Sequence, residues 1–263
     1  MPQNDQPFEI LDGDMNCGLL LLGDHATNIV PEEYGDLGLP REQFERHIAY
    51  DIGIEPLVRS LSELLNAPAV MSRFSRLLID PNRGADDPTL VMRISDGAIV
   101  PGNHPISADQ IQDRIERFHA PYHQAIDEMI DRMIETGHRP AVLSFHSFTP
   151  SWKGVERPWH GGILWDSDPR FPKFLFERFA EHDGLVIGDN EPYDGALKND
   201  TMYAHCTKRG LAHALIEIRQ DLISDASGVD NWLEIMQSVL EPMKQKTDLY
   251  QQQFFPSRCD GPL

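Results

Sequence analysis

A short apolar run that ends in a histidine is the feature that most constrains how this chain can fold. Residues 140–150 read Pro-Ala-Val-Leu-Ser-Phe-His-Ser-Phe-Thr-Pro, so an apolar run leads to His146 and then breaks into serine, threonine and proline. A run of this length and composition predicts a buried β-strand. Open α/β sheets bind their ligands at the carboxyl ends of such strands. We therefore expect His146 to lie at that edge of a sheet.

Two further apolar runs carry polar side chains in a comparable way. The run over 18–22 is followed by Gly23, Asp24 and His25, and the run over 213–221 carries Glu217 and Arg219 two residues apart. Two imidazoles and one carboxylate that come from separate strands are typical of a zinc hydrolase. Each histidine has an alternative reading as a hydrogen-bonded loop residue.

Predicted strands and helices alternate along the chain. Strands are expected at about 18–22, 67–71, 76–79, up to His146, 162–165, 184–187 and 213–221, and helices over 41–66, 107–136, 171–181, 199–209 and 230–252. Ser107 and Gln110 form a capping-box signature, and Gly210 is placed to end a helix. The alternation predicts an α/β protein, a single three-layer α/β/α domain over 1–263 with a central mixed, mostly parallel sheet. Residues 1–15 are expected to be loosely ordered.

Charge and cysteine content exclude several classes of protein. A net charge of −19 argues against nucleic acid and anionic membrane surfaces as partners, although a local basic pocket could still bind an anionic small molecule. The amino terminus lacks the features of a signal peptide, and no apolar run is long enough to span a bilayer. Three cysteines without metal-ligand spacing favour reduced thiols and a cytoplasmic location.

The third metal ligand is open at this point. His47 and Asp51 lie four residues apart on the predicted helix over 41–66 and would share a face. One could bind the metal and the other orient a ligand, or the pair could simply help the helix to dock. Asn28 follows His25 by three residues, but a neutral amide is a poor zinc ligand.

Glu217 lies inside an apolar strand, where an unpaired carboxylate is costly to bury. It therefore requires either a metal-bound water or a basic partner, and a salt bridge to a structural arginine is the alternative to a catalytic role.

The arginines around residues 80–83 predict an anion site. Arg73 and Arg76 precede the sequence Asp-Pro-Asn-Arg, which ends in Asn82 and Arg83. Guanidinium groups bind carboxylates through two parallel hydrogen bonds, so the cluster fits an acidic amino acid. Arginines on loops are otherwise usually solvated.

The chain resembles the N-formylglutamate amidohydrolase family. The resemblance covers about residues 18–223 and rests on stretches that occur in family order, at 23–25, 46–51, 75–83, 145–148, 161–165, 190–193 and 216–221.

The resemblance implies a phosphorylase/hydrolase-like fold of the zinc-exopeptidase type, related to carboxypeptidases and the aspartoacylase group. It also implies one zinc ion, with Asn82 and Arg83 on a substrate carboxylate and Glu217 as general base. Those relatives begin the metal site with His-x-x-Glu, whereas this chain has His25-Ala-Thr-Asn28. The ligands are accordingly expected to be His25, His146 and, third, His47 before Asp51.

The leading hypothesis is hydrolysis of an N-acyl amino acid, with N-formyl-L-glutamate giving formate and glutamate. Arg76 or Arg219 would then bind the second carboxylate, and the imidazole nitrogens of His25 and His146 should lie about 3–4 Å apart. A carboxypeptidase-like metallopeptidase would use the same residues. A non-catalytic binding protein for an acidic small molecule is the alternative that the Asn28 departure motivates. The acyl group and the oligomeric state are not set by the sequence.

Overall fold

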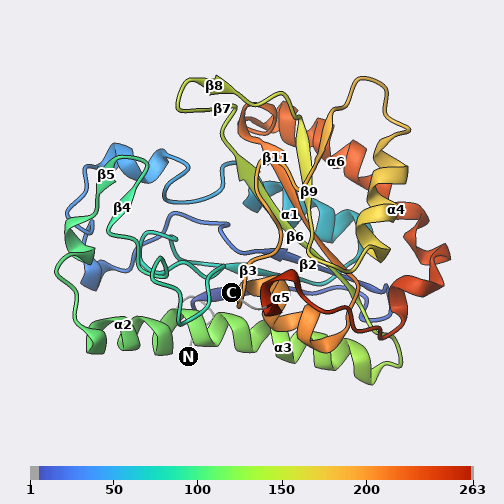
Figure 1. The fold of residues 1–263 in the computed structure, drawn as a ribbon, viewed down its shortest axis with the longest axis horizontal. Coiled ribbons are helices and arrows are strands. Elements are labelled where there is room, and N and C mark those ends of the chain that lie inside the picture. Colours follow the sequence, from blue (N-terminus) through green and yellow to red (C-terminus); the bar gives the residue numbers. More distant parts are fainter. Residues whose placement is uncertain (1–5, 262–263) are drawn as a thin grey trace.

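The computed structural model describes residues 6–261, and its centre is a seven-stranded mixed sheet (Figure 1). The strands follow the order β1-β3-β2-β6-β11-β9-β10. Their bounds are β1 Phe8–Leu11, β2 Leu19–Gly23, β3 Ala69–Ser72, β6 Ala141–Phe148, β9 Gly161–Leu164, β10 Ile187–Asp189 and β11 His213–Arg219. Two small hairpins lie outside this sheet, β4 Ile94–Ser95 with β5 Ala98–Ile99 and β7 Ser151–Trp152 with β8 Val155–Glu156.

The middle of the sheet is parallel and its two flanks are mixed. Strands β3, β2, β6 and β11 run in the same direction, so their carboxyl ends meet at one edge. At one flank β1 pairs antiparallel with β3, and at the other β9 pairs antiparallel with β11. The register sets His146 of β6 beside Glu217 of β11. This pairing delivers two of the predicted functional residues to the same point.

Helices cover both faces of the sheet, as Figure 1 shows. Helices α1 (Ile54–Leu65) and α4 (Arg170–Phe179) pack with α6 (Ala226–Leu240) on one face. On the other face, α2 (Ala108–Arg114) leads through one π turn into α3 (Ala120–Glu135), which packs beside α5 (Thr201–His205). Burial of the strands on both sides explains why β2 is continuously apolar and why β6 begins with the apolar run Ala-Val-Leu. The predicted three-layer α/β/α class is confirmed.

The long helix predicted over 41–66 is wrong in its first half. A short 3₁₀ turn covers Arg41–Glu45, and irregular turns lead to α1. Gly53 adopts a left-handed conformation with φ of 82° directly before the helix, and a Cβ there would lie 2.2 Å from the Ile223 carbonyl oxygen. The helix therefore begins only at residue 54, and Pro56 lies in its first turn, where no backbone donor is required.

Other boundaries differ for local reasons. Residues 76–78 form a turn instead of the predicted strand, and α6 ends at Leu240, because Pro242 has no N–H to continue it. Of the segment expected to be loosely ordered, Phe8–Leu11 is strand β1, and residues 1–5 lie outside the described part. The capping box at Ser107 and the left-handed Gly210 are confirmed. Within residues 6–261, no helix has the length and apolar character to cross a membrane.

We expect Gly162→Ala to destabilise the sheet beside Glu217. An added Cβ would lie 1.9 Å from the carbonyl oxygen of Glu191, a backbone atom that cannot move freely. Overpacking of this kind costs about 1–3 kcal/mol of unfolding free energy or more. Chemical denaturation would measure the loss. Gly261→Ala is the matched control, since its Cβ would have no heavy atom closer than 3.9 Å. Equal stability of the two variants would contradict the close packing at β9.

Candidate active site

A cavity of about 520 Å³ opens at the carboxyl edge of the parallel strands. Seven of the residues predicted from sequence line it, namely His25, His47, Arg76, Asn82, Arg83, His146 and Glu217. They come from the ends of β2, β6 and β11, from the loop after β3 and, for His47, from the turns before α1. The shared edge of the sheet thus brings together residues that are up to 192 positions apart (217 − 25).

His25, His146 and Asp51 form a group that could hold a metal ion. The Nδ1 atoms of the two histidines lie 3.1 Å apart, which confirms the predicted spacing. The Oδ2 atom of Asp51 lies 2.9 Å from Nδ1 of His146 and 3.4 Å from Nδ1 of His25. All three side chains are buried. Two imidazole nitrogens and one carboxylate oxygen therefore converge on a single point.

Two more buried carboxylates fix the orientation of the imidazoles. Nε2 of His25 lies 2.7 Å from Oδ1 of Asp80, and Nε2 of His146 lies 3.0 Å from Oδ2 of Asp24. A carboxylate accepts hydrogen bonds, so each Nε2 carries its hydrogen and each Nδ1 is directed toward Asp51. Carboxylate partners of this kind fix the tautomer and the ring direction of metal-binding histidines.

Asp24 has no exposed surface and accepts hydrogen bonds on both oxygens. Tyr122 and Thr201 donate to Oδ1, and Ser144 and His146 donate to Oδ2. Burial alone would raise the pKa of Asp24, but His146, His25 and Ser144 hold that pKa well below its usual range. Burial likewise opposes a charged His146, yet Asp24 and Asp51 raise its pKa to about 10. The imidazole is thus held between two carboxylates that favour a cation at this place.

The geometry favours Asp51 over the other candidates for the third ligand. His47 lines the cavity but its Nε2 faces Asp96 at 3.5 Å, outside the group. Asn28 donates its amide to the carbonyl oxygen of Phe44. Both His47 and Asp51 were predicted to lie on one face of a helix over 41–66; the observed turns instead bury Asp51, whose N–H donates to the carbonyl oxygen of His25.

Glu217 is buried and its Oε2 atom has no hydrogen-bond partner. Burial raises its pKa to about 8, and the positive charges of His146, Arg76 and Arg157 only partly offset this effect. The reading of Glu217 as a residue that braces Arg219 does not fit, because the Arg219 guanidinium binds Asp221. Glu217 also lines the cavity, and a buried carboxylate oxygen without a partner calls for a bound water or ligand as its explanation.

The predicted arginines have different roles. Arg76 is held by Asp80 at 2.8 Å and by Asp51 at 3.4 Å, so it serves the carboxylates around the histidines. Arg83 lines the cavity and donates within its own loop to the carbonyl oxygen of Asn82. Arg219 does not line the cavity: besides Asp221, it donates to two main-chain carbonyl groups. Its prediction as a substrate-binding residue is therefore not supported by its position.

Comparison with known proteins identifies the family. The sequence pattern of the N-formylglutamate amidohydrolase family matches residues 17–224. The chain belongs to the N-formylglutamate amidohydrolase family. Membership supports hydrolysis of an amide bond as the reaction and a small molecule as the substrate. The comparison with curated proteins gives no significant match.

Two solved structures are similar over almost the whole chain. A gene product of Agrobacterium tumefaciens is 30% identical, with a TM-score of 0.82, and the match covers 91% of this chain and 96% of the other. An N-formylglutamate amidohydrolase from Ralstonia eutropha is 18% identical, with a TM-score of 0.69 and coverage of 92% and 98%. The second similarity shows a shared fold.

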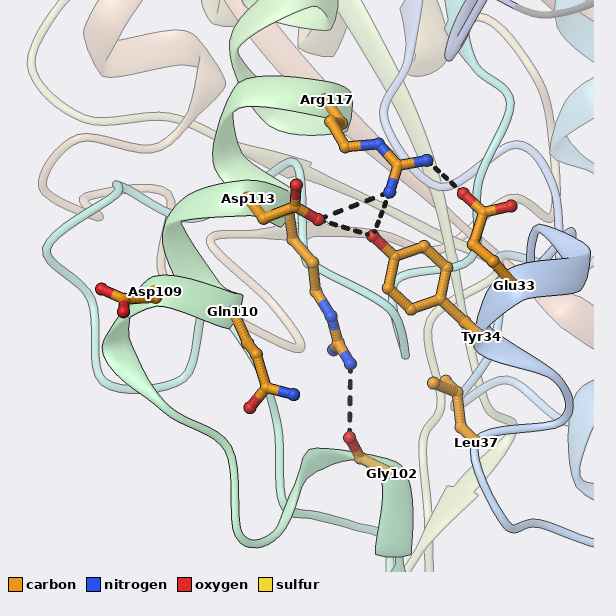
Figure 2. Close-up of a pocket in the computed structure, with 9 residues that line it drawn as sticks. Glu33, Tyr34, Leu37, Gly102, Asp109, Gln110, Asp113 and Arg117 are labelled. Carbon is orange, nitrogen blue, oxygen red and sulfur yellow. Dashed lines mark hydrogen bonds and ion pairs between the residues drawn. The ribbon is translucent and has the colours of Figure 1, made fainter.

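A second cavity, of about 450 Å³, lies beside α2 and the π turn, away from the histidine group. Figure 2 shows that Arg117 pairs with Glu33, Asp113 and the Tyr34 hydroxyl. Arg114 is buried beneath the ring of Tyr34 and donates to main-chain carbonyl groups. None of the residues predicted to carry chemistry lines this cavity. We therefore assign the chemistry of the family to the first cavity.

Sequence reasoning missed the residues that orient the histidines. No role was assigned to Asp24, although it directly precedes His25 at the end of a buried strand. Ser144 lies two residues before His146 and therefore on the same face of its strand, which is a readable signal. Thr201 and Tyr122 could not be found in this way, because they reach Asp24 from helices on the far side of long connections.

We expect Asp51→Asn to weaken metal retention and His47→Ala to leave it intact. The first change removes a carboxylate charge from the group, and the second alters a side chain outside it. Zinc affinity of Asp51→Asn should fall by at least the roughly 10–100-fold that loss of an orienting partner alone costs. Competition with a chelator, read out by metal analysis, measures both variants. Loss of zinc in His47→Ala with full retention in Asp51→Asn would reverse the assignment.

Proposed function

We propose that this chain is a zinc-dependent amidohydrolase that cleaves N-acyl amino acids, with N-formyl-L-glutamate as the best candidate substrate. The observation that carries the proposal is the unpartnered Oε2 of Glu217, buried at the cavity beside the group of His25, His146 and Asp51. Without a reaction partner, this carboxylate would be a costly feature.

The donor set of the group fits zinc. Catalytic zinc sites use three nitrogen or oxygen ligands and leave a fourth position open. Here Nδ1 of His25, Nδ1 of His146 and Oδ2 of Asp51 would be those ligands, and Asp80 and Asp24 would hold the imidazoles from behind. When bound, zinc supplies polarisation of the acyl carbonyl group and a lower pKa for the attacking water.

Glu217 would act as the general base and then as the general acid. Its pKa of about 8 lies near neutrality, where a carboxyl group can both take and return a proton. It would accept a proton from the attacking water and donate it to the amide nitrogen as the C–N bond breaks. Placement on β11 beside His146 of β6 fixes the carboxylate at the cavity rather than on a mobile loop.

Asn82 and Arg83 would bind the carboxylate of the amino acid. Both residues line the cavity. The guanidinium of Arg83 donates to the carbonyl oxygen of Asn82, and the side-chain oxygen of Asn82 accepts from the N–H of Thr201. Arg76 is partly buried and pairs with Asp51 and Asp80, and its Nε hydrogen has no partner. It would supply the second cation for a dianionic substrate such as N-formyl-L-glutamate.

Other features agree with a small-molecule enzyme of the cytoplasm. The net charge of −19 argues against nucleic acid as a partner. Cys17, Cys206 and Cys259 are all free thiols, as expected in a reducing compartment. The alternative of a binding protein without metal rested on Asn28 in place of a glutamate, and Asp51 would supply the carboxylate that Asn28 does not.

Glu217→Gln should abolish most of the activity without loss of zinc. The amide keeps the shape of the side chain but cannot accept the proton, so kcat should fall roughly 10²–10⁴-fold. Formate release from N-formyl-L-glutamate, zinc content and thermal melting would be measured on one preparation. A variant that melts much earlier but keeps near-normal kcat when folded would show that Glu217 is structural.

Arg83→Ala should raise KM at least tenfold, whereas Arg219→Ala should leave KM unchanged. Loss of a charge-assisted contact costs about 1.5–3 kcal/mol, and Arg219 lies outside the cavity wall. A panel of N-formyl derivatives of glutamate, glutamine and leucine, together with a peptide substrate, would identify the preferred side chain. Equal KM for wild type and Arg83→Ala on the best substrate would remove Arg83 from the site.

A further inference from the structure

Three histidines gather behind the loop that carries Asn82 and Arg83. His119 ends the π turn, His123 lies on the first turn of α3, and His205 ends α5. The ring centroids of His119 and His123 are 4.2 Å apart, and His123 stacks on His205 at 5.0 Å. None of the three rings lines the cavity. The cluster is therefore separate from the metal group.

The cluster binds main-chain carbonyl groups on both sides of Asn82. Nε2 of His123 lies 2.9 Å from the carbonyl oxygen of Pro81, and Nε2 of His119 lies 2.8 Å from that of Arg83. A carbonyl oxygen can only accept, so both Nε2 atoms must carry hydrogens. Two fixed points on either side of one residue restrict the backbone dihedrals of the segment between them.

The contacts of His123 continue as a chain that needs one additional proton. Nδ1 of His123 lies 2.7 Å from Nε2 of His205, and Nδ1 of His205 lies 2.8 Å from Oδ1 of Asp127. Three hydrogen bonds between the Pro81 carbonyl group and the Asp127 carboxylate require three protons. Two neutral imidazoles supply two. With His123 protonated on Nε2 only, His205 must carry hydrogens on both nitrogens.

The charges around the cluster agree with this count. Burial, followed by the charges of His119 and His205, lowers the pKa of His123 to about 3. Burial also lowers the pKa of His119. Asp127 is ionised, because the hydrogen bonds and charges of His205 and Arg209 outweigh its burial and lower its pKa. The positive charge of the chain is thus adjacent to Asp127, which Arg209 also contacts at 3.1 Å.

The charges of two further carboxylates act on the rings. Asp24 acts on His123 and Asp80 acts on His119 through their charges. Both aspartates are occupied by hydrogen bonds to other groups, Asp24 to four side chains and Asp80 to His25, Arg76 and the Asn82 N–H. The additional proton of the histidine chain therefore lies in the hydrogen bond between Nδ1 of His205 and Oδ1 of Asp127.

We propose that His119, His123 and His205 are positioning residues that hold the 81–83 loop so that Asn82 and Arg83 face the substrate carboxylate. This role rests on the proposed function, in which Asn82 and Arg83 bind that carboxylate. The amide of Asn82 is further fixed by the N–H of Thr201, on the same helix as His205. Helices α3 and α5 together therefore set the direction of the loop.

Two variants of His123 separate the loop contact from the contact with His205. In His123→Gln the amide nitrogen reaches about the position of Nε2, so a donor to the Pro81 carbonyl group is kept. In His123→Asn the amide reaches only about the position of Nδ1, so that donor is lost while an acceptor for His205 remains. Gln124→Ala, on the exposed side of α3, is the matched control, because its amide binds only Glu128.

Steady-state kinetics of the zinc-loaded enzyme with N-formyl-L-glutamate provide the first readout. We expect His123→Asn to raise KM about tenfold with kcat within about twofold of wild type, as for a lost binding contact. His123→Gln should recover most of the loss, and Gln124→Ala should match wild type. Equal damage in His123→Asn and His123→Gln, or a fall in kcat with unchanged KM, would overturn the positioning role.

Nitrogen-15 NMR of the wild-type imidazoles at pH 7 provides a second readout that requires neither substrate nor variants. We expect hydrogens on Nε2 only for His119 and His123, and on both nitrogens for His205. A hydrogen on Nδ1 only of His123, or a neutral His205, would overturn the arrangement even if His123→Asn fails to fold. A wild type with the expected tautomers that hydrolyses no N-acyl amino acid would overturn the proposed function instead, and with it the substrate role of the loop.

Discussion

The structure depends on the neutralisation of four carboxylates in a small buried volume. Asp24, Asp51 and Asp80 are almost fully buried, and Glu217 lies beside them. Among the described residues, Arg76 is the permanent cation that binds two of the aspartates. An unpaired buried charge is too costly to retain, so the remaining charge must be met by protonated imidazoles, by a shifted pKa or by a bound cation. A divalent ion between His25, His146 and Asp51 would satisfy this requirement directly, so the electrostatics and the donor geometry both support a metal at this group.

The parallel part of the sheet makes this concentration of charge possible. Strand ends that meet at one edge bring their side chains together without any local sequence signal. The helices on both faces of the sheet exclude water from these strands. Rigid strands position His146 and Glu217, whereas His25, Asp51 and the 80–83 segment lie on loops. These loops are fixed by side chains from other elements: Asp24 collects donors from β6, α3 and α5.

Much of this arrangement could be predicted from the sequence, and the failures have identifiable physical causes. Apolar runs that end in polar residues predicted the strands that carry or precede His25, His146 and Glu217, because a strand buried on both faces has a run of apolar residues that is easily recognised. His47 and Asp51 were both candidates for the third ligand on a helix predicted over 41–66, with His47 placed first; the left-handed Gly53 and the contacts of Asp51 with distant residues overrode that helical pattern. Arg219 lies two residues from Glu217, yet a carboxylate two positions further on holds it outside the cavity. Spacing along a strand predicts which residues share a face but not the partner that each side chain finds.

Asp80 shows why the metal group and the substrate loop cannot be treated as separate sites. Its Oδ1 accepts from Nε2 of His25 at 2.7 Å and from the N–H of Asn82 at 2.9 Å, while its Oδ2 accepts from Arg76 at 2.8 Å. One carboxylate therefore orients a metal-binding imidazole and also begins the loop that presents Asn82 and Arg83. Rotation of Asp80 to improve one contact would lengthen the others, because its two oxygens are fixed relative to each other. Under the proposed function, the distance between the reacting carbonyl group and the substrate carboxylate would be set by this single rigid group, and such a fixed separation would favour amino acids over ligands in which the two groups are spaced differently.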